Sequence, residues 1–314
     1  MRDRSEKRTP IGSPSRHSSS PRTLLLRAGF HDAARAGRLL GDPALLPFLL
    51  DDPQSDDVGE EGVIPGGFAS AERSRRPGGR PAEVRLGPVR EELIDSLALT
   101  SDPDMALLSL VRLAEAAATA ESGHLASAGG VEAGCTTRPA VLLRSVMSEP
   151  AAGPREHRRR LLAVLGASQA LGDFLVAHPE HLSALAPDRA WDAPQEPSAG
   201  EALRRAVGDV LGRADPADAA PSDSDKGPSQ PGDAAVGRAT AALRRAYRDR
   251  LTAIVADDLT SADPIEHVPT VCRRMTALAD AALDAALLVA RAAVGPRADE
   301  VALAVIAMGK TGAR

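Results

Sequence analysis

Apolar residues recur every three or four positions along several stretches of the chain, and this spacing predicts helices. The two longest stretches cover residues 243–259 and 271–293. A third follows Asp102-Pro103, a pair that favours a helix start because aspartate caps a helix and proline fits its first position. A fourth covers 158–174, where Gly166 loosens the middle and two helices are expected to meet closely. The chain is therefore predicted to be mainly α, as a helical bundle.

Segments rich in Pro, Gly, Ser and charged residues interrupt these patterns and offer little to bury. They predict long disordered inserts between helical parts. The predicted organisation is a disordered tail over 1–22, a helical region over 23–185 with a loop insert near 51–87 and a loop over 123–139, a disordered insert over 186–235, and a helical hairpin over 236–297.

The pattern changes near residue 301. Residues 301–307 form an apolar run without helical period, which predicts a strand buried on both faces. Gly309-Lys310-Thr311-Gly312 follows it directly. Glycines let backbone N–H groups approach an anion, and lysine supplies a mobile positive charge. The residues themselves therefore predict the beginning of a phosphate-binding loop.

Gly309-Lys310-Thr311 also copies the end of the P-loop motif. That motif requires a glycine five residues before Gly309, where this chain has Ala304 inside the predicted strand. The spacing leaves no room for a separate phosphate loop between strand and lysine, so a P-loop is the less favoured reading.

Two further groups of residues could carry chemistry. His178 and His181 flank Pro179-Glu180 and could bind a metal, but two imidazoles are too few for such a site, and a short helix beginning at the proline is the simpler interpretation. Arginines on the 243–259 helix could contact a phosphate or an acidic partner, or could simply be solvated. They are Arg244, Arg245, Arg248 and Arg250.

Composition narrows the class of protein. Hydrophobic residues make up 43% of the chain but aromatic residues only 2%, so alanine and leucine must build the core. A net charge of -5 provides no overall positive field, which argues against a nucleic-acid partner and against an anionic membrane surface. Cys135 and Cys272 form no disulfide framework, and no apolar stretch reaches membrane-spanning length. We therefore expect a cytoplasmic protein.

Three segments, in order, resemble the N-terminal region of the glutamine synthetase adenylyltransferase family, also called glutamate-ammonia-ligase adenylyltransferases. The segments are 161–180, 243–259 and 303–314. The last is the most specific, because family members end a strand in Ala-Met-Gly-Lys and continue with Gly-Ala-Arg, as residues 307–310 and 312–314 do here. Thr311 departs from the leucine or cysteine expected between them. The low aromatic content resembles actinobacterial members.

The resemblance implies a fold and an activity. Residues 298–314 would begin an α+β nucleotidyltransferase domain in a bifunctional enzyme of nitrogen metabolism. The matched residues Gly309, Lys310 and Gly312 would approach nucleotide or phosphate, with a solvated turn lysine as the alternative for Lys310. The family moves AMP from ATP to a tyrosine of glutamine synthetase and removes it by phosphorolysis, with Mg²⁺. Its partners would be glutamine synthetase and, as a further candidate, a PII-type nitrogen-signalling protein.

One feature of the family is missing from this chain. The Asp-x-Asp pair that holds Mg²⁺ should follow Arg314, so the sequence predicts a truncated domain with no catalytic or metal-binding residue, inactive in isolation, and with a frayed, unpaired strand. The alternative function is a non-catalytic helical module that binds glutamine synthetase or a nitrogen-signalling protein. An unrelated helical protein with a chance Met-Gly-Lys sequence is a third reading.

Overall fold

The structure is a computed structural model that describes residues 20–49, 88–127, 138–148, 156–187, 198–212 and 233–306. Helices form nearly all of these segments, so the predicted mainly α class is confirmed. Residues 1–19 of the tail predicted over 1–22, the insert predicted near 51–87, Cys135 and residues 307–314 lie outside the described residues, while Pro21 and Arg22 at the end of that tail begin a helix.

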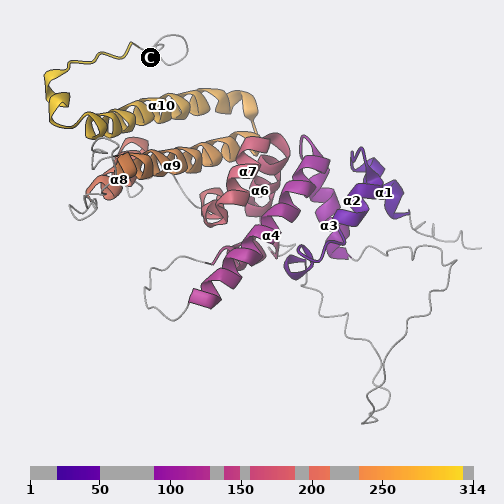
Figure 1. Ribbon diagram of the computed structural model, residues 1–314. Helices are drawn as coiled ribbons and strands as arrows, with labels where there is room; N and C mark the ends of the chain where they lie inside the picture. Colours follow the sequence, from indigo (N-terminus) through magenta and orange to yellow (C-terminus); the bar gives the residue numbers. More distant parts are fainter. Residues whose placement is uncertain are drawn as a thin grey trace, which may run out of the picture.

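The long helix α4 is the centre of the first core. It contacts α2, α3, α5, α6 and α7, and Figure 1 shows it between the N-terminal helices and the α6–α7 pair. Its buried residues include Leu107, Leu110 and Leu113, none of which exposes any surface. The helices of this core are α1 (Pro21–Arg27), α2 (Ala33–Leu39), the short 3-10 helix η1 (Leu46–Phe48), α3 (Pro88–Leu97), α4 (Pro103–Ser127), α5 (Pro139–Met147), α6 (Glu156–Ala167) and α7 (Gln169–Ala177).

The start of α4 follows the prediction. Pro103 is its first residue, and the Asp102 carboxylate accepts a hydrogen bond from the Met105 N–H at 2.9 Å. Its end does not follow the prediction, because the helix continues through Gly123 to Ser127 where a loop was expected. A single glycine costs a helix only about 1 kcal/mol, which the buried face of a 25-residue helix readily offsets.

A sharp corner joins α6 to α7, as the sequence predicted. The two helices are bent by 119°, and the Ser168 hydroxyl caps α7 by accepting a hydrogen bond from the Leu171 N–H at 3.3 Å. The close approach at Gly166 is made to the turn before α4. A Cβ on Gly166 would lie 2.8 Å from Thr100 Cβ, and the Ser101 hydroxyl donates to the Gly166 carbonyl at 2.7 Å.

A helix, α8 (Ala199–Gly212), lies within the segment 186–235 for which a disordered insert was predicted. The prediction is wrong for these residues, because Leu203 and Val207 are fully buried against α9 and α10 and α8 is part of the fold. Residues 233–235 of that insert are also helical, and 188–197 and 213–232 lie outside the described residues.

A capping box begins α8. The Ser198 N–H donates to the Glu201 carboxylate at 2.9 Å, and the Glu201 N–H donates to the Ser198 hydroxyl at 3.2 Å. The pKa of Glu201 lies below its ordinary value. The hydrogen bond with the Ser198 backbone is the largest cause, and the hydrogen bond with the Ser198 side chain is the second. The ionised carboxylate is therefore the form that fits this helix start.

Two long helices complete the described fold. They are α9 (Asp233–Leu259) and α10 (Pro264–Val294), which lie side by side with α8 against them (Figure 1). The Asp263 carboxylate caps α10 by accepting a hydrogen bond from the Glu266 N–H at 3.0 Å, and Pro264 is its first residue. Leu203, Val207, Ala239, Leu278 and Ala285 form a second core between these three helices.

The last helical turn is η4 (Gly295–Glu300), after which residues 301–306 follow without regular structure. Val301, Leu303 and Ile306 are 61%, 67% and 83% exposed. The strand predicted to be buried here is therefore not formed, since no described segment offers an adjacent strand with which its backbone could pair.

Among the described residues, no single helix has both the length and the apolar character needed to span a membrane. Within the same residues, α6 and α7 reach the required length and apolar character only when they are taken together, and a bend of 119° separates them.

Candidate functional site

The three residues predicted to bind nucleotide or phosphate, Gly309, Lys310 and Gly312, lie outside the described residues. Their arrangement stays a prediction. One set of polar side chains that the structure does bring together lies where the two cores meet, around η2 (Pro179–Leu185), which follows α7 and packs on α9. This junction and the groove beside it form the candidate site.

The first group at the junction is an ion-pair cluster between α6, α9 and α10. Arg160, whose side chain is only 6% exposed, donates its Nε–H to the Leu185 carbonyl at 2.8 Å and its Nη1–H to Asp257. The other oxygen of the Asp257 carboxylate accepts from Arg274 at 2.7 Å. The Asp257 carboxylate on α9 therefore links α9 to α6 through Arg160 and to α10 through Arg274. Arg160 also links α6 to η2 through the Leu185 carbonyl.

The second group contains the histidines singled out in the sequence. His181 Nδ1 lies 2.7 Å from an Asp249 carboxylate oxygen on α9, and His178 Nδ1 lies 3.4 Å from Glu180. Phe174 packs against both, with ring centroids 5.4 Å from His178 and 5.1 Å from His181, and the two imidazole rings lie edge to face at 6.0 Å. The predicted short helix does begin at Pro179, and across the residues described here no three His, Cys, Asp or Glu side chains are arranged to hold a metal.

The four arginines singled out on α9 were expected either to contact a phosphate or an acidic partner or to be solvated, and the structure places them in different surroundings. Arg250 is buried, at 7% exposure, and belongs to the packed face. Arg248 places its guanidinium 5.9 Å from the Phe174 ring centroid, which is a cation–π contact. Arg244 and Arg245 are exposed. Exposure of this kind is what contact with an acidic or phosphate partner would need.

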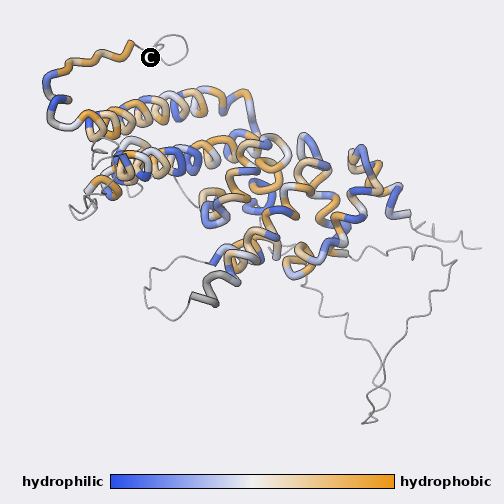
Figure 2. The backbone as a smooth tube through the Cα atoms, in the orientation of Figure 1, coloured by the Kyte–Doolittle hydropathy of each residue, from blue (hydrophilic) through white to orange (hydrophobic). Residues whose placement is uncertain are grey.

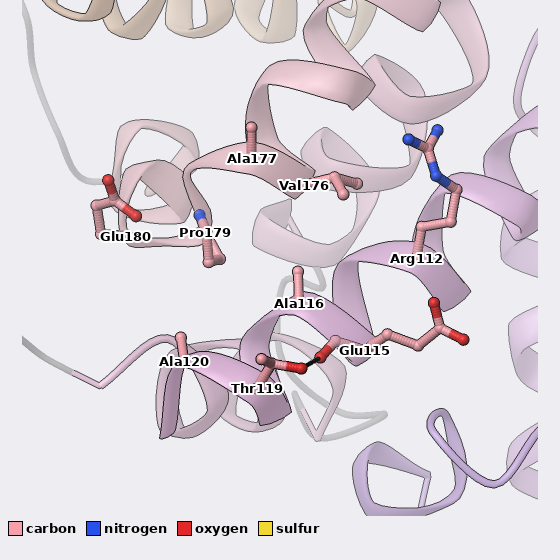
Figure 3. A pocket seen from close by; sticks show the side chains of 9 residues that line it. All are labelled: Arg112, Glu115, Ala116, Thr119, Ala120, Val176, Ala177, Pro179 and Glu180. Carbon is pink, nitrogen blue, oxygen red and sulfur yellow. Dashed lines mark hydrogen bonds between the residues drawn. The ribbon is translucent and has the colours of Figure 1, made fainter. Parts of the chain in front are cut away.

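A groove of about 580 Å³ runs beside the junction, between α4 and the turn from α7 into η2 (Figure 3). The small residues Ala116, Ala120 and Ala177 are among those that line it. Charged residues stand at its ends, with Glu180 at one and Arg112 at the other. Arg112 is itself paired with Asp173 at 2.6 Å, and the Thr119 hydroxyl donates to the Glu115 carbonyl at 2.8 Å.

The chemistry of this arrangement is that of binding and positioning. Asp257 accepts from two arginines and Asp249 contacts His181, so these polar groups hold α6, η2, α9 and α10 in register. The groove has an apolar floor and charged ends, which suits a polypeptide segment better than a small reacting molecule.

The ion-pair cluster was missed from sequence, although one signal for it exists. The apolar face of α9 runs through Tyr247 and Ile254, and the same spacing reaches Asp257. An acidic residue on a buried helical face needs a cationic partner, but the sequence does not say that Arg160, almost a hundred positions away, supplies it.

Comparisons with known proteins point to one family. The sequence profile of the family described as glutamate-ammonia ligase adenylyltransferase matches residues 158–314, which is half of the chain and runs from α6 through α10. Several curated proteins named bifunctional glutamine synthetase adenylyltransferase/adenylyl-removing enzyme are similar to the chain. One from Mycolicibacterium smegmatis is 37% identical over 226 residues, and one from Streptomyces avermitilis is 34% identical over 231 residues.

A third such protein, from Bifidobacterium longum, is 32% identical over 224 residues. These alignments cover 71–73% of this chain but only 17–18% of the relatives, so the chain spans less than a fifth of their length. The relatives are actinobacterial, as the resemblance indicated. No solved structure matches the chain.

Proposed function

Because the chain belongs to the glutamate-ammonia ligase adenylyltransferase family, we propose that it is the helical N-terminal part of an enzyme that adenylylates and deadenylylates glutamine synthetase. The observation that carries this proposal is the family match over residues 158–314, which includes the junction cluster and the three-helix unit of α8, α9 and α10. The proposed reaction moves AMP from ATP to a tyrosine of glutamine synthetase with release of pyrophosphate, and phosphorolysis removes the AMP as ADP. The proposed location is the cytoplasm.

ATP and Mg²⁺ are the proposed nucleotide and metal. Gly309, Lys310 and Gly312 would approach the phosphates, the glycines through backbone N–H groups and the lysine through its charge. The acidic residues that the structure describes do not fit a Mg²⁺ site, because none of them gather in a group able to hold a metal ion. No step through the metal is therefore assigned to these residues.

We propose further that the 314 residues alone do not transfer adenylyl groups, since they correspond to less than a fifth of the relatives. The test incubates the purified chain with glutamine synthetase, ATP and Mg²⁺, and then measures AMP on glutamine synthetase by mass spectrometry. The complete Mycolicibacterium smegmatis enzyme is the positive control. We expect modification with that enzyme only, and modification by the chain alone would overturn the proposal.

The groove favours a second function, a non-catalytic module that binds glutamine synthetase. Its apolar floor and charged ends could receive a segment of that protein. The test is binding of immobilised glutamine synthetase to the wild-type chain and to Ala177→Arg, which adds a long charged side chain at an exposed residue that lines the groove. Leu26→Arg is the matched control, because Leu26 is exposed on α1.

We expect Ala177→Arg to weaken this binding about tenfold or more and Leu26→Arg to leave it unchanged. Equal affinity of both variants would exclude the groove, and no binding by the wild-type chain would exclude the module. A PII-type nitrogen-signalling protein is the second proposed partner, and the same three chains test it.

A further inference from the structure

His181 connects η2 to α9, the helix that both cores share. Its Nδ1 lies 2.7 Å from an Asp249 carboxylate oxygen, and the two side chains are only 22% and 16% exposed. The helix α9 packs in the first core through Ala256 and in the second through Ala239. Figure 2 shows a hydrophilic stretch along α9 between its hydrophobic parts. The His181–Asp249 contact is therefore a polar connection between η2 and this shared helix that is largely shielded from water.

The other ring nitrogen of His181 also faces a carboxylate. Its Nε2 lies 4.0 Å from Oε1 of Glu180, the same oxygen that His178 Nδ1 approaches at 3.4 Å. Asp249, His181, Glu180 and His178 thus form a row in which carboxylates and imidazoles alternate, which we call the carboxylate–imidazole row. A ring with a carboxylate oxygen near each nitrogen suits the imidazolium ion, because that ion has a proton to donate on both nitrogens.

The neutral form of His181 satisfies only one of the two contacts. An ionised carboxylate accepts hydrogen bonds but cannot donate one, so the Nδ1 that faces Asp249 must carry the proton. Nε2 of the neutral ring then has a lone pair, which the negative Glu180 repels. Loss of the second proton also weakens the bond to Asp249, because a hydrogen bond between two ionised groups is stronger than one with a neutral donor.

The elements packed against η2 bring further charged groups to this region, and these have other partners. They are Arg248 over the Phe174 ring, Arg160 at Asp257, His157 at the Leu182 carbonyl, Arg112 at Asp173, Arg144 over the Phe48 ring, and Glu115 in the wall of the groove. Arg248 and His181 pack on the same Phe174 ring. The single positive charge of Arg248 opposes a second proton on His181, while two carboxylates within 4.0 Å of the ring nitrogens favour it.

We propose that His181 is a pH-sensitive link between η2 and α9, which the imidazolium ion holds firmly and the neutral ring holds less firmly. Imidazole ordinarily changes charge near about pH 6.5. A histidine that gains a carboxylate partner on folding contributes stability that is present at low pH and is lost as the pH rises. Because Pro179 and Glu180 of η2 also line the groove, the same proton fixes one wall of that groove.

The first test is a double-mutant cycle with His181→Asn and Asp249→Asn, each of which removes a charge and keeps a polar side chain. Urea unfolding of the wild-type chain, the two single variants and the double variant gives the coupling as a ratio of unfolding equilibrium constants. We expect this coupling to be about fivefold to tenfold larger at about pH 5.5 than at about pH 8. A coupling that is the same at both pH values, or larger at the higher one, would overturn the proposal.

The His31–Asp104 pair provides the matched control. His31 Nδ1 lies 3.3 Å from an Asp104 oxygen, but the imidazole side chain is 90% exposed. The cycle of His31→Asn and Asp104→Asn should therefore change by less than about twofold over the same pH range, because water screens an exposed pair. An equal change in both cycles would contradict the role given to the shielded position of His181.

Nitrogen-15 NMR tests the same link in the wild-type chain, without any effect of a substitution on folding. Ring-nitrogen shifts distinguish the imidazolium ion from the two neutral tautomers, and the His181→Asn spectrum assigns the signals. We expect protons on both nitrogens of His181 at about pH 5.5 and on Nδ1 alone at about pH 8. A neutral ring at the lower pH, or a proton on Nε2 alone at the higher pH, would overturn the proposal.

Glu180 is tested separately, since it supplies the second carboxylate. Glu180→Gln should reduce the pH-dependent gain in His181–Asp249 coupling about twofold, because Nε2 then faces a neutral amide. Glu115→Gln removes another exposed glutamate that lines the groove and should leave the gain unchanged. Equal reductions in the two variants would assign the effect to the overall charge of the groove and would contradict the carboxylate–imidazole row.

Discussion

Asp257 is the residue on which three helices depend. Its carboxylate accepts hydrogen bonds from the nearly buried Arg160 and from Arg274. Asp257→Ala would leave Arg160 charged and without its carboxylate in a place that water barely reaches. We expect the free energy of unfolding to fall by about 3 kcal/mol, the size of effect typical of a broken buried pair. Urea denaturation followed by circular dichroism measures it.

A matched control for Asp257→Ala is Asp173→Ala. The Arg112–Asp173 pair has the same chemistry, but both side chains are nearly half exposed. Its loss should cost less than about 1 kcal/mol because water and salt screen such a pair. Equal losses in the two variants would contradict the structural role given to Asp257.

Gly166 is required for a different reason, the absence of a side chain. In Gly166→Ala the new Cβ would lie 2.8 Å from Thr100 Cβ and 3.1 Å from the Asp102 carbonyl oxygen. We expect a loss of about 1–3 kcal/mol, since the corner between α6 and α7 would have to move away from α4. Thermal unfolding of the variant gives the value.

Gly208 provides the control, because it lies inside α8 with nothing within 4 Å of an added Cβ. Gly208→Ala should stabilise the protein by about 0.5–1 kcal/mol, the difference in helix propensity. A stabilising Gly166→Ala would show that the approach to Thr100 is looser than described.

At the scale of elements, the start of α8 should respond to pH. Hydrogen bonds from Ser198 lower the pKa of Glu201, so the folded state binds the proton more weakly than the unfolded state. The stability that Glu201 contributes is therefore fully present above its ordinary value of 4.5 and is lost as the pH falls through the lower folded-state pKa. NMR titration of the Glu201 side chain should show a midpoint below 4.5.

Two substitutions separate the causes. Ser198→Ala removes the hydroxyl and should raise the midpoint partway, whereas Ser198→Pro also removes the backbone N–H, the larger cause, and should raise it further. A midpoint that stays the same in both variants would disprove the capping explanation.

The elements differ in how far the sequence predicted them. The start of α4 and the α6–α7 corner were predictable, because Asp102-Pro103 and Gly166 to Ser168 act through local backbone chemistry. The helix α8 was missed, since its flanks are rich in Pro, Asp and Ser and only Leu203 and Val207 are fully buried. Residues 301–307 were predicted as a strand from an apolar run, but a strand also needs a neighbour, and the described residues 301–306 have none.

In the candidate site too, features set by local sequence were predicted and features set by packing between distant helices were not. His178 and Pro179 were recognised, and the short helix that they begin is confirmed. The pairing of Arg160 with Asp257 depends on packing between distant helices, which no local pattern records. The candidate phosphate residues, Gly309, Lys310 and Gly312, remain a prediction.

At the scale of the whole molecule, two cores share one helix. The second half of α9 reaches the first core through Ala256, while its first half belongs to the second core through Ala239. Val207→Asp would place a charge in the second core only. We expect hydrogen exchange to quicken in α8, in α10 and in the first half of α9, while α4 and α6 keep their protection.

Hydrogen exchange with mass spectrometry resolves these helices separately. Val141→Asp is the control, because Val141 is exposed on α5. Loss of protection throughout the chain in Val207→Asp would show that the two cores unfold as one unit.

The order of the helices along the chain also affects synthesis of the protein. The helix α8 packs on α9 and α10, and both follow it in the sequence. A ribosome adding about 5–20 residues per second needs roughly 4–16 seconds for the roughly 80 residues from the end of α8 to the end of α10. During that interval the apolar side of α8 has no native surface to contact, so the nascent chain is open there to chaperones before it can close its second core.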